Sequence, residues 1–265
     1  MSAFIPLIYL GIAFIPLHGA PNLFFESKDW NDGKAEILHY QVLRPYRGDT
    51  LKEKAEWISE RGFYLSDSGL FSRKSQGQEV LQSIMRRTGQ AEGFSISAFS
   101  TVRFDRKFPK TRWWQTASLH GIYGAHWRKV TKEEGKIRLS TESSGLDIAR
   151  SVEDLNASLI TEEMLFTYLR NIPNQKGYVE EIWLLDSQLG DVTTSRVQYA
   201  KIEVVNEAIL VKDLTTYQIQ IIREDGKKME FWLHIQGLHP IVKAHLVDGS
   251  EWTLQGWERK KYWSF

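Results

Sequence analysis

The sequence predicts a mainly β protein with a few helices, built as an antiparallel meander that curls into an incomplete or half β-barrel. The second half of the chain consists of strand-like runs separated by short turn sequences. The first half contains segments in which apolar and polar residues alternate with the period of a half-buried strand. Two stretches have a helical pattern instead, and we expect these helices at the concave face of the sheet. No linker divides the chain, so residues 21–265 are expected to form one domain.

The first residues resemble a secretory signal peptide. Residues 3–20 form an uncharged apolar run that ends in small residues. No Lys or Arg precedes the run, and Pro21 follows the expected cleavage position, so an uncleaved anchor and a buried strand stay open as alternatives. We take residues 1–20 as a signal peptide and expect a periplasmic or secreted protein.

Strands are expected from residue 34 onward. Residues 34–43 follow a turn, residues 53–67 bend at Gly62, and residues 93–104 alternate cleanly. Residues 111–130 are rich in aromatic side chains and contain two glycines that permit a bend or bulge. Residues 133–143 are expected to return as a hairpin.

Two segments are predicted to be helical. Residues 77–90 place Val80, Leu81, Ile84 and Met85 on one side and reach Gly89, a typical helix end. Residues 161–173 begin with a threonine and two glutamates, which suit a helix N-terminus, and end at a proline. The polar segment 143–159 between them is expected to be a loop or lid.

The chain after residue 177 predicts a long up-and-down meander. Six runs, from "YVEEIWLLDS" to "EWTLQGWERKKYW", alternate with turn-like separators such as "EDGKK", "GLHP" and "DGS". Strands of this length with little helix between them favour a sheet that curls into a full or partial barrel.

Composition excludes several function classes. With 34 basic and 33 acidic residues the net charge is +1, which gives no overall bias toward nucleic acid. The chain has no cysteine, so thiol catalysis, thiolate metal sites and lipidation at cysteine are excluded.

Three histidines between residues 230 and 252 raise the question of a metal site. His234 and His245 lie on neighbouring predicted strands, and His239 lies in the "GLHP" turn between them. A hairpin that pivots at this turn would place residue 234 opposite about 243, which makes His234 and His245 at most a diagonal pair. Because no three ligands converge, we expect no metal and no other cofactor.

Catalytic motifs are absent from the sequence. There is no G-x-S-x-G elbow, no phosphate-binding glycine loop, and the adjacent carboxylates at 180–181 point to opposite faces of a strand. We therefore expect no enzymatic activity, with an envelope hydrolase as the least favoured alternative.

The tryptophans supply the positive argument for a ligand. Ten Trp residues are present, most of them on predicted strands, and they either fill a core or line a cavity between sheet and helices. Periodicity does not distinguish a filled barrel from a hollow one. The candidate cavity-lining residues are Trp113, Trp114, Trp183, Trp232, Phe94 and Phe104.

Several segments resemble a family of uncharacterised secreted bacterial proteins. The segments are "YVEEIWLLDS", "IIREDGKKMEFWLHIQGLHPIVKAHLVDG" and "WNDGKAEILHYQV", and the resemblance covers roughly half of the chain, mainly at turns and aromatic positions. More remotely, the layout is similar to lipoprotein carriers of the LolA and LolB type. That resemblance implies an incomplete barrel, closed by helices, that binds acyl chains; none of those carriers' ligand residues matches a position here.

The expected function is therefore a periplasmic, non-enzymatic protein that binds or carries a hydrophobic or amphiphilic ligand in a half-barrel. The expected partner is a small amphiphile or a lipoprotein acyl chain, without nucleic acid, and any membrane contact is expected to be transient. The alternative is a cell-envelope interaction or scaffold module with a filled core.

Overall fold

The computed structural model describes residues 23–65, 70–72, 77–91, 93–105, 108, 113–121, 124–133, 136–143, 146–153, 159–175, 177–185, 197–211 and 214–261. The signal peptide expected at residues 1–20 lies outside these residues. The described part contains no helix that is long and apolar enough to cross a membrane.

Sixteen strands of the described residues form one sheet. Their bounds are β1 Lys34–Tyr46, β2 Asp49–Leu65, β3 Leu70–Ser72, β4 Gln78–Ala91, β5 Phe94–Phe104, β6 Trp113–Gly121, β7 Gly124–Glu133, β8 Lys136–Ser143, β9 Leu146–Glu153, β10 Leu159–Thr161, β11 Val179–Leu185, β12 Val197–Val211, β13 Leu214–Arg223, β14 Lys228–His234, β15 Ile241–His245 and β16 Glu251–Lys261. Helical segments are short: α1 Leu23–Glu26 and α2 Leu165–Tyr168, with the 3-10 turns η1 Lys28–Asp32, η2 Glu162–Met164 and η3 Leu169–Asn171.

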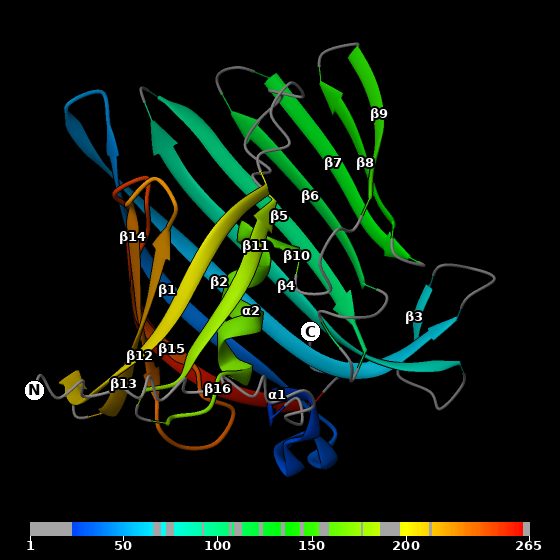
Figure 1. Cartoon of the computed structure of the whole chain (residues 1–265). Helices are drawn as coiled ribbons and strands as arrows, with labels where there is room; N and C mark the ends of the chain where they lie inside the picture. The colour runs from blue at the N-terminus through cyan, green and yellow to red at the C-terminus, as the bar shows by residue number, and fades with distance from the viewer. Residues whose placement is uncertain are drawn as a thin grey trace, which may run out of the picture.

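The sheet is a curled, open meander. Its strand order is β10-β11-β12-β13-β14-β15-β16-β1-β2-β4-β5-β6-β7-β8-β9, with β3 added beside β2. Neighbours pair antiparallel, except β10 with β11. Among the described residues the end strands β9 and β10 do not pair with each other, so the barrel is incomplete, as predicted. Figure 1 shows the strands β11 to β13 curled in front of the long strands β2, β4 and β5.

One helical stretch lies inside the curl. The segments η2, α2 and η3 follow one another over residues 162–171, close to the helix predicted at 161–173. In Figure 1, α2 lies between the β11–β12 side and the β2–β4 side of the sheet. We call this segment the helical stretch, and the sheet face that it covers the concave face.

The main core lies between the helical stretch and the concave face. Buried side chains from both sides of the curl join one hydrophobic cluster, including Leu38, Leu81, Phe104, Ile219 and Phe231. Strand alternation explains which residues enter it. On β5, for example, the even-numbered residues Val102 and Phe104 are buried, whereas Phe99 is exposed on the other face.

The helix predicted at residues 77–90 is wrong, because these residues form β4. The apolar spacing that suggested a helix also fits a strand, and hydrogen bonding decides between the two. β4 pairs with β2 from Gln78 to Gly89 and with β5 from Leu81 to Ala91, so both of its edges are satisfied inside the sheet. Gly89 does not end a helix but lies within the strand.

The expectation of a loop or lid over residues 143–159 is also corrected. Residues 146–153 form β9, which pairs with β8, and residues 159–161 form β10. Of the two glycines expected to bend residues 111–130, Gly121 ends β6 and Gly124 begins β7, opposite each other in one hairpin. The six runs predicted after residue 177 are confirmed as β11 to β16 in the expected order.

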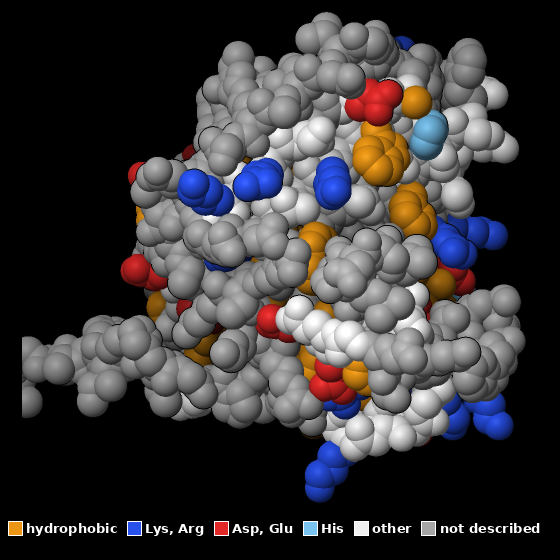
Figure 2. Space-filling model, turned by 90° about the vertical axis from the view of Figure 1, so that its right-hand side faces the viewer, with side chains coloured by type: hydrophobic (Ala, Val, Ile, Leu, Met, Phe, Trp, Pro, Cys, Tyr) orange, Lys and Arg blue, Asp and Glu red, His pale blue; other side chains and the backbone are white. Residues whose placement is uncertain are grey.

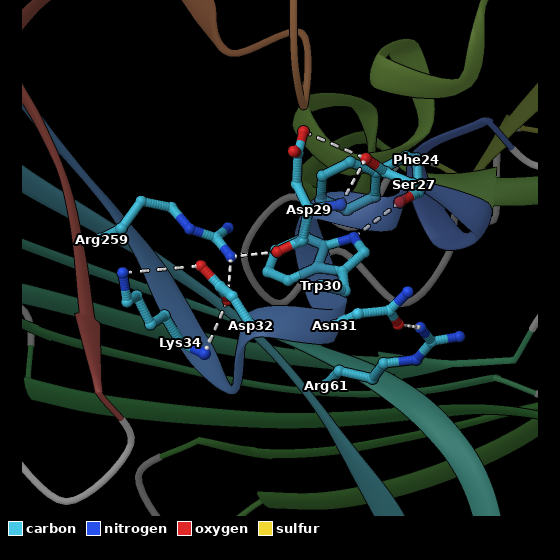
Figure 3. A network of polar contacts seen from close by, with 9 residues as sticks. All are labelled: Phe24, Ser27, Asp29, Trp30, Asn31, Asp32, Lys34, Arg61 and Arg259. Atoms are coloured by element: carbon cyan, nitrogen blue, oxygen red, sulfur yellow. Dashed lines mark hydrogen bonds and ion pairs between the residues drawn. The ribbon is translucent and has the colours of Figure 1, made fainter.

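Polar contacts fix the segment before β1 to the end of strand β16 (Figure 3). The Trp30 indole donates to the Phe24 carbonyl at 2.7 Å, and the two rings meet edge to face at 5.3 Å. Arg259 of β16 bonds the Asp29 carbonyl and lies 2.7 Å from Asp32. The Phe24 amide donates to the Asn171 side chain at 2.9 Å, which joins this segment to the helical stretch. The segment before β1 and the helical stretch therefore support each other.

Candidate functional site: the concave face

An aromatic cluster occupies the centre of the concave face. Phe166 of α2 stacks on Trp57 of β2 with ring centroids 4.9 Å apart and an interplanar angle of 15°. It also lies 4.9 Å from Trp252 of β16 and 5.8 Å from Phe231 of β14. One helical side chain thus contacts three strands, and this part of the half-barrel is filled by side chains.

Polar bonds join the start of the helical stretch to both sides of the curl. Glu162 accepts a hydrogen bond from Arg223 of β13 at 2.9 Å, and Glu163 accepts one from Arg128 of β7. The Thr161 hydroxyl donates to Gln115 of β6 at 2.6 Å. Because β13 and β7 lie far apart in the strand order, residues 161–163 connect the two sides across the concave face.

A buried ion pair fixes the other end of the helical stretch. Arg170 donates to Glu36 of β1 at 2.6 Å and to the Leu238 carbonyl at 2.8 Å. Both charged side chains are buried. Burial raises the pKa of the Glu36 carboxyl, and the neighbouring Arg170 opposes that rise. Pairing in a dry environment makes this contact a structural anchor.

A second charged cluster lies on the concave face beyond the helical stretch. The buried Glu53 carboxylate of β2 bonds Arg44 of β1 at 2.8 Å and lies 3.2 Å from Arg87 of β4. Gly89 provides the space for this arrangement, because a Cβ there would lie 2.6 Å from Cγ of Glu53. Burial lowers the pKa of Arg87, and the neighbouring Glu53 and Asp248 carboxylates offset only part of that decrease. The Arg44 and Arg87 side chains are 25% and 18% exposed.

A small apolar crevice opens between the helical stretch and the loop after β15. It has a volume of about 90 Å³, and its apolar lining comes from both sides: Leu165, Phe166, Met229, Phe231, Leu246 and Val247. Glu162 and Asp248 complete the lining. Asp248 also acts electrostatically on Arg87 of the Arg44–Glu53–Arg87 cluster.

The concave face extends over strands β4 to β8. Register and alternation place Met85, Ala98, Ala117, Leu119 and Leu139 on this face, and all five are half-buried. Leu119 packs against Leu51 and Ile96 in a separate small cluster. We call this half-buried apolar surface of β4 to β8 the flared wall.

The six candidate residues from the sequence separate into different environments. Phe104 and Trp113 are fully buried on the concave face. Trp114 follows Trp113 directly and so lies on the opposite face. Trp232 packs outside against His245, with ring centroids 5.0 Å apart, and Trp183 is half-buried beside the core. The side chain of Phe94 is not among those that the structure describes. That these six residues line a ligand site stays a prediction.

The expected register, with residue 234 opposite about 243, is wrong, and His234 and His245 do not form a diagonal pair. A register shift places Trp232 opposite Lys243 and Leu233 opposite Ile241, so His234 has no partner on β15. The His234 amide instead bonds the Pro240 carbonyl at 3.0 Å, and its ring lies 5.8 Å from Trp257. His245 pairs with Glu230 on one side and Glu251 on the other. The two histidines therefore belong to separate contacts.

Comparison with solved structures identifies a fold neighbour. The chain is similar to a β-barrel-like protein of a domain of unknown function, DUF1849, from Brucella abortus. The TM-score is 0.53 at 10% sequence identity, covering 85% of this chain and 97% of that one. No family model matches the chain, and no curated protein matches it either. The similarity shows a shared β-barrel-like fold, which is the fold expected from the sequence.

Proposed function

We propose that the protein is a non-enzymatic binding protein of the bacterial cell envelope that holds a hydrophobic or amphiphilic ligand on its concave face. The flared wall carries this proposal, because Ala98, Ala117 and Leu119 are half-buried apolar side chains outside the main core, next to Met85 and Leu139, which pack against that core. The crevice beside Phe166 offers an end point for an acyl chain. A lipid or a lipoprotein acyl chain is the ligand that fits best.

The Arg44–Glu53–Arg87 cluster suits the polar end of such a ligand. It lies on the concave face beside the flared wall, and its two arginines share one buried carboxylate. Guanidinium groups bind carboxylate and phosphate oxygens in a fixed geometry. A ligand with its chain on the flared wall would bring an acidic head group to these arginines.

Fluorescence of a dansyl-labelled fatty acid tests this proposal, together with mass spectrometry of a lipid extract of the purified protein. Val247→Trp fills the crevice, and we expect it to weaken probe binding at least tenfold. Val179→Trp is the matched control, since Val179 is 41% exposed on β11 and lies outside the crevice lining. Equal binding by both variants would place the ligand elsewhere.

A filled core favours a second function, an interaction or scaffold module of the cell envelope. Phe104 and Trp113 are fully buried, and the Phe166 cluster leaves only a small crevice beside it. If no amphiphile copurifies and the dansyl probe does not bind, the carrier proposal fails and this second function stands.

A further inference from the structure

The outer face of the sheet carries two exposed aromatic side chains in one row. Trp127 of β7 is 49% exposed and Phe99 of β5 is 39% exposed. Both pair with Ser118 of β6, so they stand two strands apart, about 10 Å, on the face opposite the main core. The serine between them is small, and both rings therefore project from the sheet.

Basic side chains flank this pair. Arg86 of β4 lies opposite Phe99, and Lys129 follows two residues after Trp127 on the same face. Arg138 of β8 lies diagonally beside Lys129, and both are exposed. Figure 2 shows hydrophobic side chains beside a row of basic ones on this side of the molecule. We call Phe99, Trp127, Arg86, Lys129 and Arg138 the outer patch.

The charge of the outer patch is positive. Lys129 pairs with Thr116 and Ser140, and Arg138 pairs with Thr131 and Ser151, so neither has an acidic residue in register. Acidic residues border the patch: Glu142 lies opposite Trp127 and diagonally from Lys129, and Glu56 lies 3.7 Å from Arg86. The partner surface that complements the patch is therefore negatively charged and accepts aromatic rings.

We propose that the outer patch docks the protein on an anionic lipid surface. Tryptophan and phenylalanine enter the boundary between head groups and acyl chains, because their rings are largely apolar. Lysine and arginine beside them are attracted to acidic head groups. The proposal does not depend on ligand binding at the concave face, which lies on the other side of the sheet.

Cosedimentation with lipid vesicles tests the outer patch. The full chain is mixed with vesicles of phosphatidylcholine alone, or with three parts phosphatidylcholine to one part phosphatidylglycerol. We expect binding to the second composition only, and weaker binding as sodium chloride is raised. Lys129→Ala with Arg138→Ala should weaken binding about fivefold per cation removed. Phe99→Ser with Trp127→Ser should abolish it.

Matched variants separate docking from folding. Val179→Ser removes another large apolar side chain of 41% exposure on β11, and Lys227→Ala with Lys228→Ala removes two exposed cations near the β13–β14 turn. Both should bind vesicles like the wild type, and all variants should keep the wild-type unfolding midpoint. Absence of binding to phosphatidylglycerol vesicles, or unchanged binding by the outer-patch variants, would overturn the proposal. So would binding to an oligonucleotide or to heparin without binding to vesicles.

Discussion

Arg170 of the helical stretch and Glu36 of β1 form a buried ion pair across 2.6 Å, at the place where three segments meet. Arg170 also bonds the Leu238 carbonyl and lies over the Phe24 ring, 4.1 Å from its centroid. One side chain thus joins the segment before β1, the helical stretch and the β14–β15 connection. The position of the helical stretch on the concave face depends on this contact.

We expect Arg170→Met to lower the free energy of unfolding by about 3–5 kcal/mol, because the buried Glu36 would lose its ion-pair partner. Urea denaturation measures this. Lys34→Ala, which removes a 40% exposed partner of Asp32 at 3.9 Å, should change stability by about 0.5 kcal/mol or less. Equal losses in the two variants would contradict a special role for Arg170.

The Glu36 pKa predicts the sign of a pH effect. Because burial raises this pKa above 4.5 in the folded state, the folded protein binds the Glu36 proton more tightly than the unfolded chain does. The contribution of Glu36 is therefore greatest below about pH 4.5 and decreases as pH rises through the raised folded pKa. The stability of the wild type relative to Glu36→Gln should fall over that range in urea titrations.

Asp225→Asn provides the opposite sign as a control. The Lys227 backbone amide lowers the Asp225 pKa below 3.8, so its contribution is present above that pH and is lost as pH falls through the folded value. A wild-type advantage over Glu36→Gln that grew with rising pH would contradict the assignment for Glu36.

The alternation of apolar and polar residues predicted much of the fold, because most strands bury one face and expose the other. The same rule could have found the charged anchors. Glu36 shares its strand face with Leu38 and Tyr40, and Glu53 shares its face with Ala55 and Trp57, so each is an acidic residue in an apolar row. A charge in such a position needs a partner. The sequence does not indicate which arginine supplies it, since Arg170 lies 134 positions away from Glu36.

The error at residues 77–90 has a different cause. The local spacing of apolar residues there fits both a helix and a strand. Only pairing with the long strands β2 and β5 on either side makes this segment the strand β4. The register shift between β14 and β15 likewise depends on how the 235–240 connection packs, with His239 at a φ of 48°. That conformation is uncommon for a residue other than glycine. Turn composition alone therefore misplaced His234.

Gly89→Ala should destabilise the protein by about 1–3 kcal/mol, because the added methyl group would overlap Glu53 inside the sheet. The loss should shrink when Glu53→Ala is introduced together with it, which a double-mutant cycle in urea would measure. Gly256→Ala is the matched control on β16, where the nearest side-chain atom to a new Cβ is 3.4 Å away. A cost for Gly89→Ala that is independent of Glu53 would contradict the steric explanation.

Phe166→Ala tests whether the aromatic cluster holds the curled sheet around the helical stretch. Phe166 is 7% exposed and contacts Trp57, Phe231 and Trp252, so its removal leaves a cavity between three strands. We expect a loss of about 3–5 kcal/mol in the free energy of unfolding. Phe99→Ala removes the same side chain from a site of 39% exposure and should cost far less. Because Trp57 and Trp252 border the new cavity, intrinsic fluorescence of the folded variant should shift to longer wavelength as water reaches their rings. An unchanged spectrum together with a small loss of stability would mean that the strands hold their curl without Phe166.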